Sequence, residues 1–343
     1  AAVTFTRSLR EDLARRDLTV NAMAMDAAGA LHDPFGGRED IRRRVLRCVG
    51  DPECRFREDA LRILRTLRFS ATLGFAIEPE THRALRTQCG DLRYVAAERV
   101  REELTKLLCG QDAGRVLEEE PQVLGVVLPE ILPCVGFDQH NRHHCYDVWG
   151  HTAHAVAAAP PDPVLRWTML LHDLGKPQCF TLDEQGVGHF HGHHRPSAEM
   201  AVNICRRLRF DKAAAQRICL LVRYHDRPIP LTERAIRRAM NQLGVDGLRQ
   251  LCAVKRADNL AQHPDYRGRQ QEIDRGEAIM EELLAKDACF SLKQLAVNGN
   301  DLLGLGLSGP AVGRTLQGLL DQVMYGTLPN DRDALLTAAG KIR

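Results

Sequence analysis

The stretch REDALRILRTLRF, residues 57–69, carries two rows of side chains at helical spacing. Leu61, Leu64 and Leu67 recur at every third position, and arginines 62, 65 and 68 follow the same period. Residues three or four apart share one face of an α-helix, so this spacing predicts a helix with an apolar face and a basic face. Similar apolar spacing continues through most of the chain beyond Glu39 and predicts a mainly α protein.

The composition narrows the class of protein further. The chain has 343 residues, enough for two or three domains, and its 44% hydrophobic and 27% charged residues are typical of a globular protein. The low aromatic content of 5% disfavours an all-β fold, and no apolar run reaches the about 18 residues of a membrane span. Eleven cysteines without a C-x-x-C pair predict reduced thiols and a cytoplasmic location.

Charge is distributed unevenly along the chain. Residues 1–115 hold 20 arginines and a single lysine, although the net charge of the whole chain is only +2. Because arginine offers a planar fork of donors to phosphates and base edges, this bias indicates contact with nucleotides or nucleic acid. A solvated helix surface explains the same composition equally well.

Asp59 and Arg62 have the chemistry needed to read a base. A carboxylate accepts from an exocyclic amino group, and a guanidinium donates to a ring acceptor. Cytosine and adenine both offer that donor and acceptor pattern, whereas uracil and guanine offer the reverse. One fixed Asp–Arg pair would therefore accept C and A, with Arg65 and Arg68 facing phosphates. An ordinary helix with ion pairs between residues three apart is the alternative.

Two further clusters share helical spacing. A helix expected over residues 11–25 would place Asp17 and Asn21 on one face, next to Arg15 and Arg16. Arg99, Glu103 and Lys106 share the face of a later helix. Residues 3–6 alternate apolar and polar side chains and predict a short strand.

Histidines concentrate in one part of the chain, because eleven of the 14 lie between His140 and His225. Within this part, LLHDLGKP places an adjacent His172 and Asp173 after an apolar helical run. Mixed imidazole and carboxylate ligands from separate helices suit a divalent cation that activates water toward a phosphate ester. The candidate ligands are His151, His172, Asp173, His193, His225 and Asp258. The residues alone do not separate His193 from His194, and Lys176 is either a phosphate contact or a solvated side chain.

In their order and spacing, four motifs resemble the class II CCA-adding enzymes of the bacterial tRNA nucleotidyltransferase and poly(A) polymerase family. They are LARRDLTVNAMAMD, DPFGGREDI, REDALRILRTLRF and ERVREELTKLL. The resemblance implies that Arg15, Arg16, Asp17 and Asn21 contact the ribose and phosphates of a nucleotide. It implies that Asp59 and Arg62 select CTP and ATP and that Arg65 and Arg68 bind triphosphate. It also implies that Arg99, Glu103 and Lys106 support this template.

The same resemblance implies two Mg²⁺-binding carboxylates in a D-x-D pair upstream of the R-R-D motif. Only 14 residues precede Arg15, and none supplies that pair, so we expect an N-terminal truncation with no catalytic residue for transfer in this chain. Asp331-Arg332-Asp333 is interpreted instead as a helix start capped by Asn330 or Asp331. Gly36-Gly37-Arg38 is interpreted as a turn.

The ordered set H…HD…H…H…D resembles the HD phosphohydrolase domain, and matching the G-H segment of that domain favours His193 over His194. The identity of the HD metal stays open. The stretch VNGNDLLGLGLSGPAVGRTLQGLL predicts helix, glycine-rich turn and helix, and resembles the tRNA-holding tail of CCA-adding enzymes.

Four segments follow from these resemblances. They are a short α/β remnant of a nucleotidyltransferase head (1–36), a helical neck (37–120), an all-α HD domain (121–270) and a helical tail (271–343). The implied partners are tRNA and nucleotides, with no membrane. Two other functions remain open: a metal-dependent phosphohydrolase with an RNA-binding half, and a non-catalytic tRNA-binding protein. The HD segment and tail disfavour a poly(A) polymerase.

Overall fold

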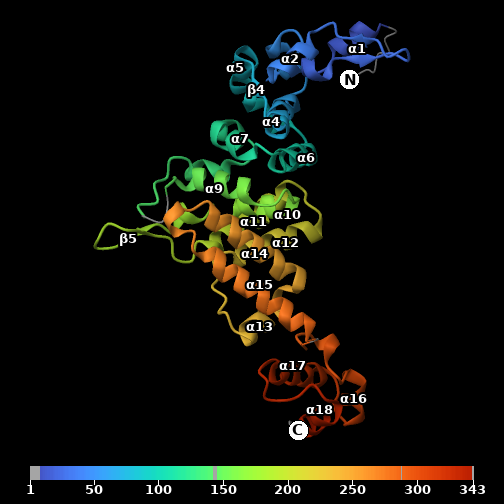
Figure 1. Ribbon diagram of the computed structural model, residues 1–343, viewed down its shortest axis with the longest axis vertical. Coiled ribbons are helices and arrows are strands. Elements are labelled where there is room, and N and C mark those ends of the chain that lie inside the picture. Colours follow the sequence, from blue (N-terminus) through green and yellow to red (C-terminus); the bar gives the residue numbers. More distant parts are fainter. Residues whose placement is uncertain (1–7, 142–144, 287, 342–343) are drawn as a thin grey trace. The chain divides into compact units, whose positions relative to one another are not determined.

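The computed structural model describes residues 8–141, 145–286 and 288–341 (Figure 1). Contacts between residues divide them into two compact units. The first unit contains the described residues up to His225 together with Arg256–Arg267, and the second contains Asp226–Lys255 and the described residues from Gly268 onward. The strand predicted over residues 3–6 lies outside the described residues, and the four predicted segment boundaries stay a prediction.

Helices dominate both units, which confirms the mainly α fold. The first unit contains α1 Leu9–Ala14, η1 Thr19–Asn21, α2 Gly37–Arg43, α3 Pro52–Glu58, α4 Leu61–Leu73, α5 Pro79–Gln88, η2 Cys89–Tyr94, α6 Ala97–Leu108, α7 Ala113–Glu119, α8 Pro121–Gly125, η3 Pro129–Cys134, α9 Val148–Ala158, α10 Pro163–Leu171, η4 Lys176–Gln178, α11 His194–Arg207, α12 Lys212–Tyr224 and η5 Pro264–Tyr266. The second contains α13 Glu233–Leu243, α15 Arg269–Ala285, η6 Leu292–Gln294, α16 Gly299–Gly304, α17 Pro310–Met324 and α18 Arg332–Gly340. Helix α14, Val245–Leu260, contributes residues to both units.

Strands are short and occur in pairs. β1 (Ala24–Met25) pairs antiparallel with β2 (Leu31–His32), and β3 (Val45–Leu46) pairs parallel with β4 (Ala76–Ile77). A third pair, β5 (Thr181–Leu182) and β6 (Gly188–His189), is antiparallel with Thr181 opposite His189. This hairpin lies within the segment predicted to be entirely helical, so the described HD segment is helical apart from it.

The helix predicted over residues 11–25 is wrong, because α1 ends at Ala14. Leu18 is fully buried and forms an isolated bridge with Cys48, while the Thr19 amide donates to the Arg47 carbonyl at 2.9 Å. Pairing with this neighbouring segment buries Leu18 in a way that a continued helix would not. The Asn21 amide still donates to the Asp17 carboxylate at 3.2 Å, but across a 3₁₀ turn.

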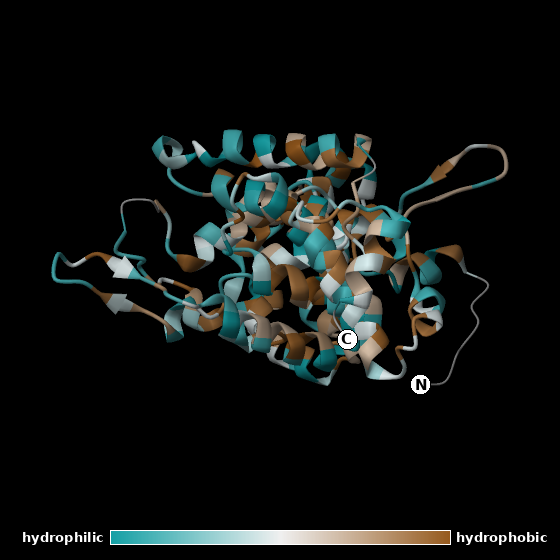
Figure 2. Ribbon diagram, turned by 90° about the horizontal axis from the view of Figure 1, so that it is seen from below, coloured by the Kyte–Doolittle hydropathy of each residue, from teal (hydrophilic) through white to brown (hydrophobic). Residues whose placement is uncertain are grey.

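Helices α4 and α6 pack against each other and form the core of the neck. Leu64 and Leu67 of α4 are fully buried, and Leu104 and Leu107 of α6 are almost so. Each buried leucine contributes about 1.5–3 kcal/mol relative to an exposed one. The apolar row predicted from residues 57–69 therefore faces this core. In Figure 2, hydrophobic (brown) and hydrophilic (teal) residues follow one another along the helices, as expected of helices with one buried face.

The turn predicted at Gly36-Gly37-Arg38 ends at Gly36, because Gly37 and Arg38 already belong to α2. The start of that helix is fixed against η1. Both oxygens of Asp33 accept hydrogen bonds, from the amides of Gly37 at 2.8 Å and Arg38 at 2.9 Å. A Cβ atom at Gly37 would overlap the carbonyl oxygen of Thr19. Since Thr19 also donates its hydroxyl to Asp40 at 2.7 Å, the close approach positions the segment that follows Asp17.

The second unit has its own apolar core, which includes Leu319, Leu320 and Leu335. Helix α16, the turn after it and α17 confirm the predicted helix–turn–helix. Asp331 caps α18 by accepting from the amides of Asp333 and Ala334, which confirms that Asp331-Arg332-Asp333 is a helix start. Across the described residues, no helix combines the length and apolar character needed to span a bilayer.

We expect Gly37→Ala to lower the free energy of unfolding by about 1–3 kcal/mol, because the added methyl group forces α2 away from the Thr19 carbonyl. Urea unfolding monitored by circular dichroism measures the change. Gly90→Ala is the matched control, since its Cβ would meet Arg93 at an ordinary 3.5 Å. Equal stability of the two variants would contradict the packing argument.

Candidate functional site

Two buried carboxylates and two arginines join helices α4 and α6 to the segment that follows α1. The Nε atom of Arg65 donates to Asp17 at 2.6 Å, and the Nε atom of Arg68 donates to Glu103 at 2.6 Å. Nη1 of Arg65 also lies 3.8 Å from Glu103. Asp17 and Glu103 are each only 6% exposed. Because a buried charge is costly without a partner, these contacts hold α4, α6 and the segment after α1 in one arrangement.

The environment of Asp17 favours its charged form. Burial alone would raise the pKa of this carboxyl, but the hydrogen bond and charge of Arg65 outweigh burial and hold the pKa below its usual value. Asn21 and the Leu18 amide add hydrogen bonds to the same carboxylate. Asp17 is therefore an anion that positions Arg65.

Asp59 and Arg62 do not share one helix. Asp59 has extended backbone angles and separates α3 from α4. One of its oxygens accepts from the Leu61 amide at 3.1 Å and the other from Arg99 at 2.9 Å. Two residues predicted from separate motifs, Asp59 and Arg99, are thus in direct contact.

Arg62 is held by oxygen acceptors from three directions. It donates to the Glu58 carboxylate at 2.6 Å, the Arg55 carbonyl at 3.1 Å and the Arg15 carbonyl at 2.9 Å. The contact with Arg15 links Arg62, the candidate for reading a base, to the R-R-D motif at residues 15–17. Glu58 is a residue that the sequence interpretation missed, although its position four residues before Arg62 is a typical ion-pair spacing.

Three predicted residues of the arginine-rich part, Arg15, Arg16 and Lys106, are exposed. The Arg15 and Arg16 side chains lie at the surface beyond α1, where Arg16 pairs with Asp12 at 3.2 Å. Lys106 is exposed on α6, the helix that carries Arg99 and Glu103. Among the predicted residues, direct contacts therefore join Asp59 to Arg99, Arg62 to the Arg15 carbonyl, and Asn21, Asp17, Arg65, Glu103 and Arg68 in one network.

The histidine candidates come from five segments of the first unit. His151 lies in α9, His172 and Asp173 directly follow α10, His193 precedes α11, His225 follows α12, and Asp258 lies in α14. All four histidines and Asp173 are at most 6% exposed, whereas the side chain of Asp258 is 23% exposed. The structure brings all six predicted residues into one cluster.

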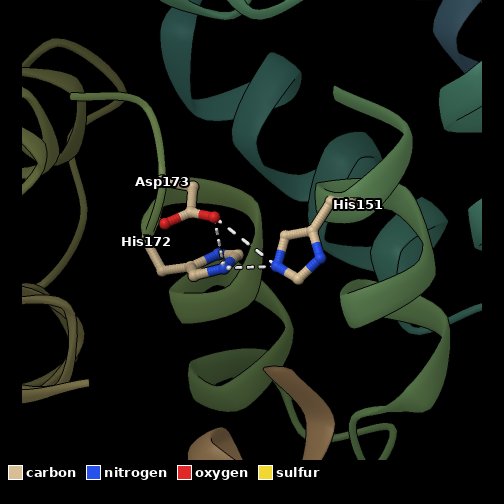
Figure 3. Close-up of side chains that lie close together, drawn as sticks. All are labelled: His151, His172 and Asp173. Carbon is tan, nitrogen blue, oxygen red and sulfur yellow. Dashed lines mark hydrogen bonds and ion pairs between the residues drawn. The ribbon is translucent and has the colours of Figure 1, made fainter. Parts of the chain in front are cut away.

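His151, His172 and Asp173 form the first group of side chains that could hold a cation (Figure 3). The Nε2 atoms of His151 and His172 lie 3.4 Å apart, and they lie 3.5 Å and 3.2 Å from Oδ2 of Asp173. Asp258 Oδ1 adds a further oxygen, 2.9 Å from Nε2 of His151 and 3.8 Å from that of His172.

Asp173, His193 and His225 form a second group. The Nε2 atoms of His193 and His225 lie 3.1 Å apart, and they lie 3.1 Å and 3.7 Å from the other oxygen, Oδ1, of Asp173. Asp173 therefore belongs to both groups, with one oxygen directed to each.

The histidine rings are oriented by hydrogen bonds from Nδ1. Nδ1 of His172 donates to the Met169 carbonyl at 2.6 Å, and Nδ1 of His225 to the Val222 carbonyl at 2.7 Å. His193 does the same toward the Phe190 carbonyl at 2.8 Å. With the proton assigned to Nδ1 by these partners, the Nε2 lone pairs face the interior, as in metal-ligating histidines.

Charges in the cluster are strongly coupled. Burial lowers the pKa of His172, but the carboxylates of Asp173 and Asp258 outweigh burial and raise it to about 10. Burial raises the pKa of Asp173, whereas His172 and Lys176 hold it well below its usual value. A proton on His172 thus balances the anions, and a bound divalent cation would take the place of that proton.

The donor set fits a divalent cation. Oδ2 of Asp173 is buried and accepts no well-oriented hydrogen bond from any described residue, although the Lys176 ammonium lies 2.7 Å away. Imidazole nitrogens and carboxylate oxygens at mutual distances of 3–4 Å are suited to surround one transition-metal ion or Mg²⁺. Among the residues that the structure describes, groups of three such ligands occur only around Asp173.

Lys176 is buried, so its interpretation as a solvated lysine is wrong. Its ammonium donates to the side chain of Gln139 at 2.8 Å, and Gln139 is itself only 1% exposed. No motif or periodicity marked Gln139 in the sequence. Gly175 brings this loop close to α11, because a Cβ there would lie 2.5 Å from the His193 carbonyl oxygen.

Together, the helical fold and the buried His–Asp cluster define a protein with an HD-type metal domain beside an arginine-rich neck. Three family matches agree with this division. Residues 1–47 match the "Poly A polymerase head domain", residues 74–133 the "Probable RNA and SrmB- binding site of polymerase A", and residues 142–262 the "HD domain".

Relatives extend over nearly the whole chain. The "A-adding tRNA nucleotidyltransferase" of Deinococcus radiodurans is 35% identical over 342 residues, covering 95% of this chain and 78% of that protein. The "CC-adding tRNA nucleotidyltransferase" of Thermus thermophilus is 36% identical, covering 95% and 76%. The solved structure of the Bacillus stearothermophilus CCA-adding enzyme with CTP has a TM-score of 0.70 and 29% identity, covering 99% and 75%. The chain belongs to the class II CCA-adding enzymes and related tRNA nucleotidyltransferases that carry an HD domain.

We expect Glu103→Gln to lower the free energy of unfolding by about 1.5–3 kcal/mol, because Arg68 and Arg65 lose a buried anionic partner. Chemical unfolding measures the loss. Glu102→Gln is the control: the neighbouring glutamate is exposed and forms no ion pair within the described residues, so the change should stay within about 0.5 kcal/mol. An equal loss of unfolding free energy in both variants would contradict the stabilising role of the Glu103 carboxylate.

Proposed function

We propose that the chain acts in the synthesis of the CCA end of tRNA, in which CMP and AMP are transferred from CTP and ATP. The near-complete match to relatives named for this reaction carries the proposal. Those relatives are named for adding A, CC or CCA, so the bases that this chain adds are left to experiment. The arginine-rich neck supplies the matching chemistry.

In this proposal, Asp59 and Arg62 read the Watson–Crick edge of the incoming base. Asp59 accepts from the amino group of cytosine or adenine, and Arg62 donates to the adjacent ring nitrogen. The contact from Arg99 orients the Asp59 carboxylate. Arg62 must then exchange at least one of its present acceptors for the base, and the exposed Glu58 carboxylate is the partner most readily replaced by solvent.

Arg15, Arg16, Asp17 and Asn21 are proposed to line the ribose and phosphate side. Arg65 and Arg68 bind carboxylates through Nε, which leaves their Nη groups as the donors proposed for phosphate. The side chain of Arg65 is 35% exposed, in keeping with such access. We propose Mg²⁺ as the cation of transfer, since it neutralises the leaving pyrophosphate.

Asp59→Ala should reduce the preference for CTP over UTP by about 10-fold or more, because a paired base contact discriminates by about 1–3 kcal/mol. Equilibrium binding of CTP and UTP to the purified chain measures the ratio of the two dissociation constants. Asp91→Ala is the control, since Asp91 is exposed and distant in sequence from the motifs.

Unchanged selectivity in a folded Asp59→Ala protein would contradict the base-reading role. Binding of tRNA by the unsubstituted chain, with no preference for CTP over UTP, would instead favour the non-catalytic RNA-binding alternative. Thermal unfolding of each variant separates loss of selectivity from loss of structure.

A second function, hydrolysis of phosphate esters, is supported by the two ligand groups that share Asp173. A divalent cation held there supplies activation of water and polarisation of a phosphate oxygen. The chain's own contribution is to orient the rings through Nδ1 and to place the buried Lys176 ammonium beside Asp173. We propose 2′,3′-cyclic phosphates and phosphomonoesters at RNA ends as substrates.

Asp173→Asn should remove metal from both groups, whereas His193→Ala should remove it only from the second. Elemental analysis of the purified protein after dialysis against Mn²⁺ or Ni²⁺ gives the number of ions per chain. Hydrolysis of 2′,3′-cyclic AMP should fall at least about 100-fold in Asp173→Asn, in line with loss of a metal site.

His191→Ala serves as the control, because His191 is exposed and stacks on His189 outside the cluster. Equal metal content in Asp173→Asn and the unsubstituted chain would overturn the assignment of the ligands. Normal metal content without hydrolysis of any of these substrates would reject the catalytic proposal and leave the metal-binding assignment in place.

A further inference from the structure

Helices α11 and α12 enclose a groove of about 620 Å³ on the side facing away from their buried residues. The buried side of α11 carries Ser197, Ala201 and Ile204, while that of α12 carries Ile218 and Leu221. The groove residues alternate with these in sequence, and all of them belong to the first unit. None of the six residues of the His–Asp cluster lines the groove, so the groove is a separate site.

Three arginines surround this groove: Arg195, Arg206 and Arg223. All three are exposed, and within the described part of the chain none of their side chains forms an ion pair or a hydrogen bond. Elsewhere in the first unit, arginines such as Arg65, Arg68 and Arg207 bind carboxylates closely. Glu199 is the single acidic residue of the lining, which leaves the groove with a net charge of +2.

The floor between the arginines is mainly apolar and includes an aromatic ring. Phe210 is partly exposed in the groove, and its ring is held edge-to-face against Trp167 at 5.1 Å. Ala198 and Leu220 extend the apolar surface, while Gln216 supplies an amide. A rigid aromatic floor with a few polar groups is typical of sites for planar organic molecules.

We propose that the α11–α12 groove binds an aromatic phosphate monoester, with a nucleoside monophosphate as the ligand class. Arg195, near the start of α11, and Arg223, near the end of α12, hold the phosphate at one end of the groove, and the base lies toward the other end, on the apolar floor beside Phe210 and Gln216. A monoester phosphate carries a charge of about −1.5 to −2 at neutral pH, which matches these two arginines. A single internal phosphodiester carries only one negative charge, so a terminal monoester is the better match for this pair.

The size of the groove supports a small ligand. Cavities for small molecules enclose about 300–1,000 Å³, and the groove lies within that range. The proposal does not depend on CCA addition or on metal-dependent hydrolysis, because none of the residues used by those functions lines the groove.

Cys219 in the groove offers a readout specific to this site. Its thiol is partly exposed, and a hydrogen bond from Cys205 lowers its pKa, which favours the reactive thiolate. Alkylation by N-ethylmaleimide, followed by mass spectrometry of the peptide that contains Cys219, reports on the groove even if AMP also binds elsewhere. We expect AMP to slow alkylation of Cys219 several-fold, and adenosine or inorganic phosphate at the same concentration to slow it much less.

The double variant Arg195→Gln/Arg223→Gln should weaken protection by AMP at least about 10-fold in half-maximal concentration, since each charge-assisted bond contributes about 1.5–3 kcal/mol. Lys212→Gln is the matched control: it removes one positive charge from α12 outside the groove lining and should leave protection unchanged. Ala215→Phe fills the groove without changing charge and should also abolish protection by AMP.

Three results would overturn the proposal. They are no protection by millimolar AMP, undiminished protection in the folded double variant, and equal protection by an oligonucleotide without a terminal phosphate. The last would assign the groove to an RNA chain. Circular dichroism melting of each variant shows that the comparison is made between folded proteins.

Discussion

The buried carboxylate of Asp173 is the constraint on which the first unit depends. It is 2% exposed, and an isolated anion there would be prohibitively costly. Five side chains surround its charge: the Lys176 ammonium at 2.7 Å and the Nε2 atoms of four histidines at 3.1–3.7 Å. These partners come from helix ends far apart in sequence. The helices must therefore converge on one point, and the apolar packing between α10, α11 and α12 is arranged around that requirement.

The neck follows the same physical rule with a different partner. Asp17 and Glu103 are buried anions, and arginines of α4 compensate them. Guanidinium groups remain charged at all relevant pH values, so this network is permanently ionised. Imidazole nitrogens can bind a metal ion, which guanidinium groups cannot, so the second cluster can take up a ligand. Buried carboxylates thus have different roles in the two clusters. In the neck they position arginine donors, and in the HD domain a buried carboxylate brings together histidines that can bind a metal ion.

Much of the architecture could be predicted from the sequence because it depends on local periodicity. The row of leucines in residues 57–69 placed Leu64 and Leu67 in the core, and the spacing of Asp331 to Asp333 identified a helix cap. The helix predicted over residues 11–25 failed because tertiary pairing of Leu18 with Cys48 overrides local propensity. The break at Asp59 has a similar origin, since contact with Arg99 is formed across 40 residues of sequence.

The residues of the candidate site also divide into those that the sequence predicts and those that only the structure shows. All six predicted residues of the metal cluster meet, yet Gln139 was missed because a single amide from a loop leaves no pattern in the sequence. The burial of Lys176 could not be predicted from the sequence either, since a lysine is usually solvated. Contacts formed only after distant segments fold together require the structure.

The histidine positions could be predicted because each helix orients its own ligand. His172 and His225 stand at the C-terminal ends of α10 and α12, where the last carbonyls of a helix lack intrahelical partners. Each Nδ1 donates to the carbonyl three residues earlier, which satisfies the helix end and turns Nε2 inward. A sequence can therefore encode ring orientation locally, in the form of a histidine directly after a helix.

It cannot encode locally which aspartate completes the site. Both histidines are followed by an aspartate, but Asp173 is buried at the convergence of the helices and Asp226 is exposed. The choice between two identical His–Asp pairs is made by tertiary packing alone.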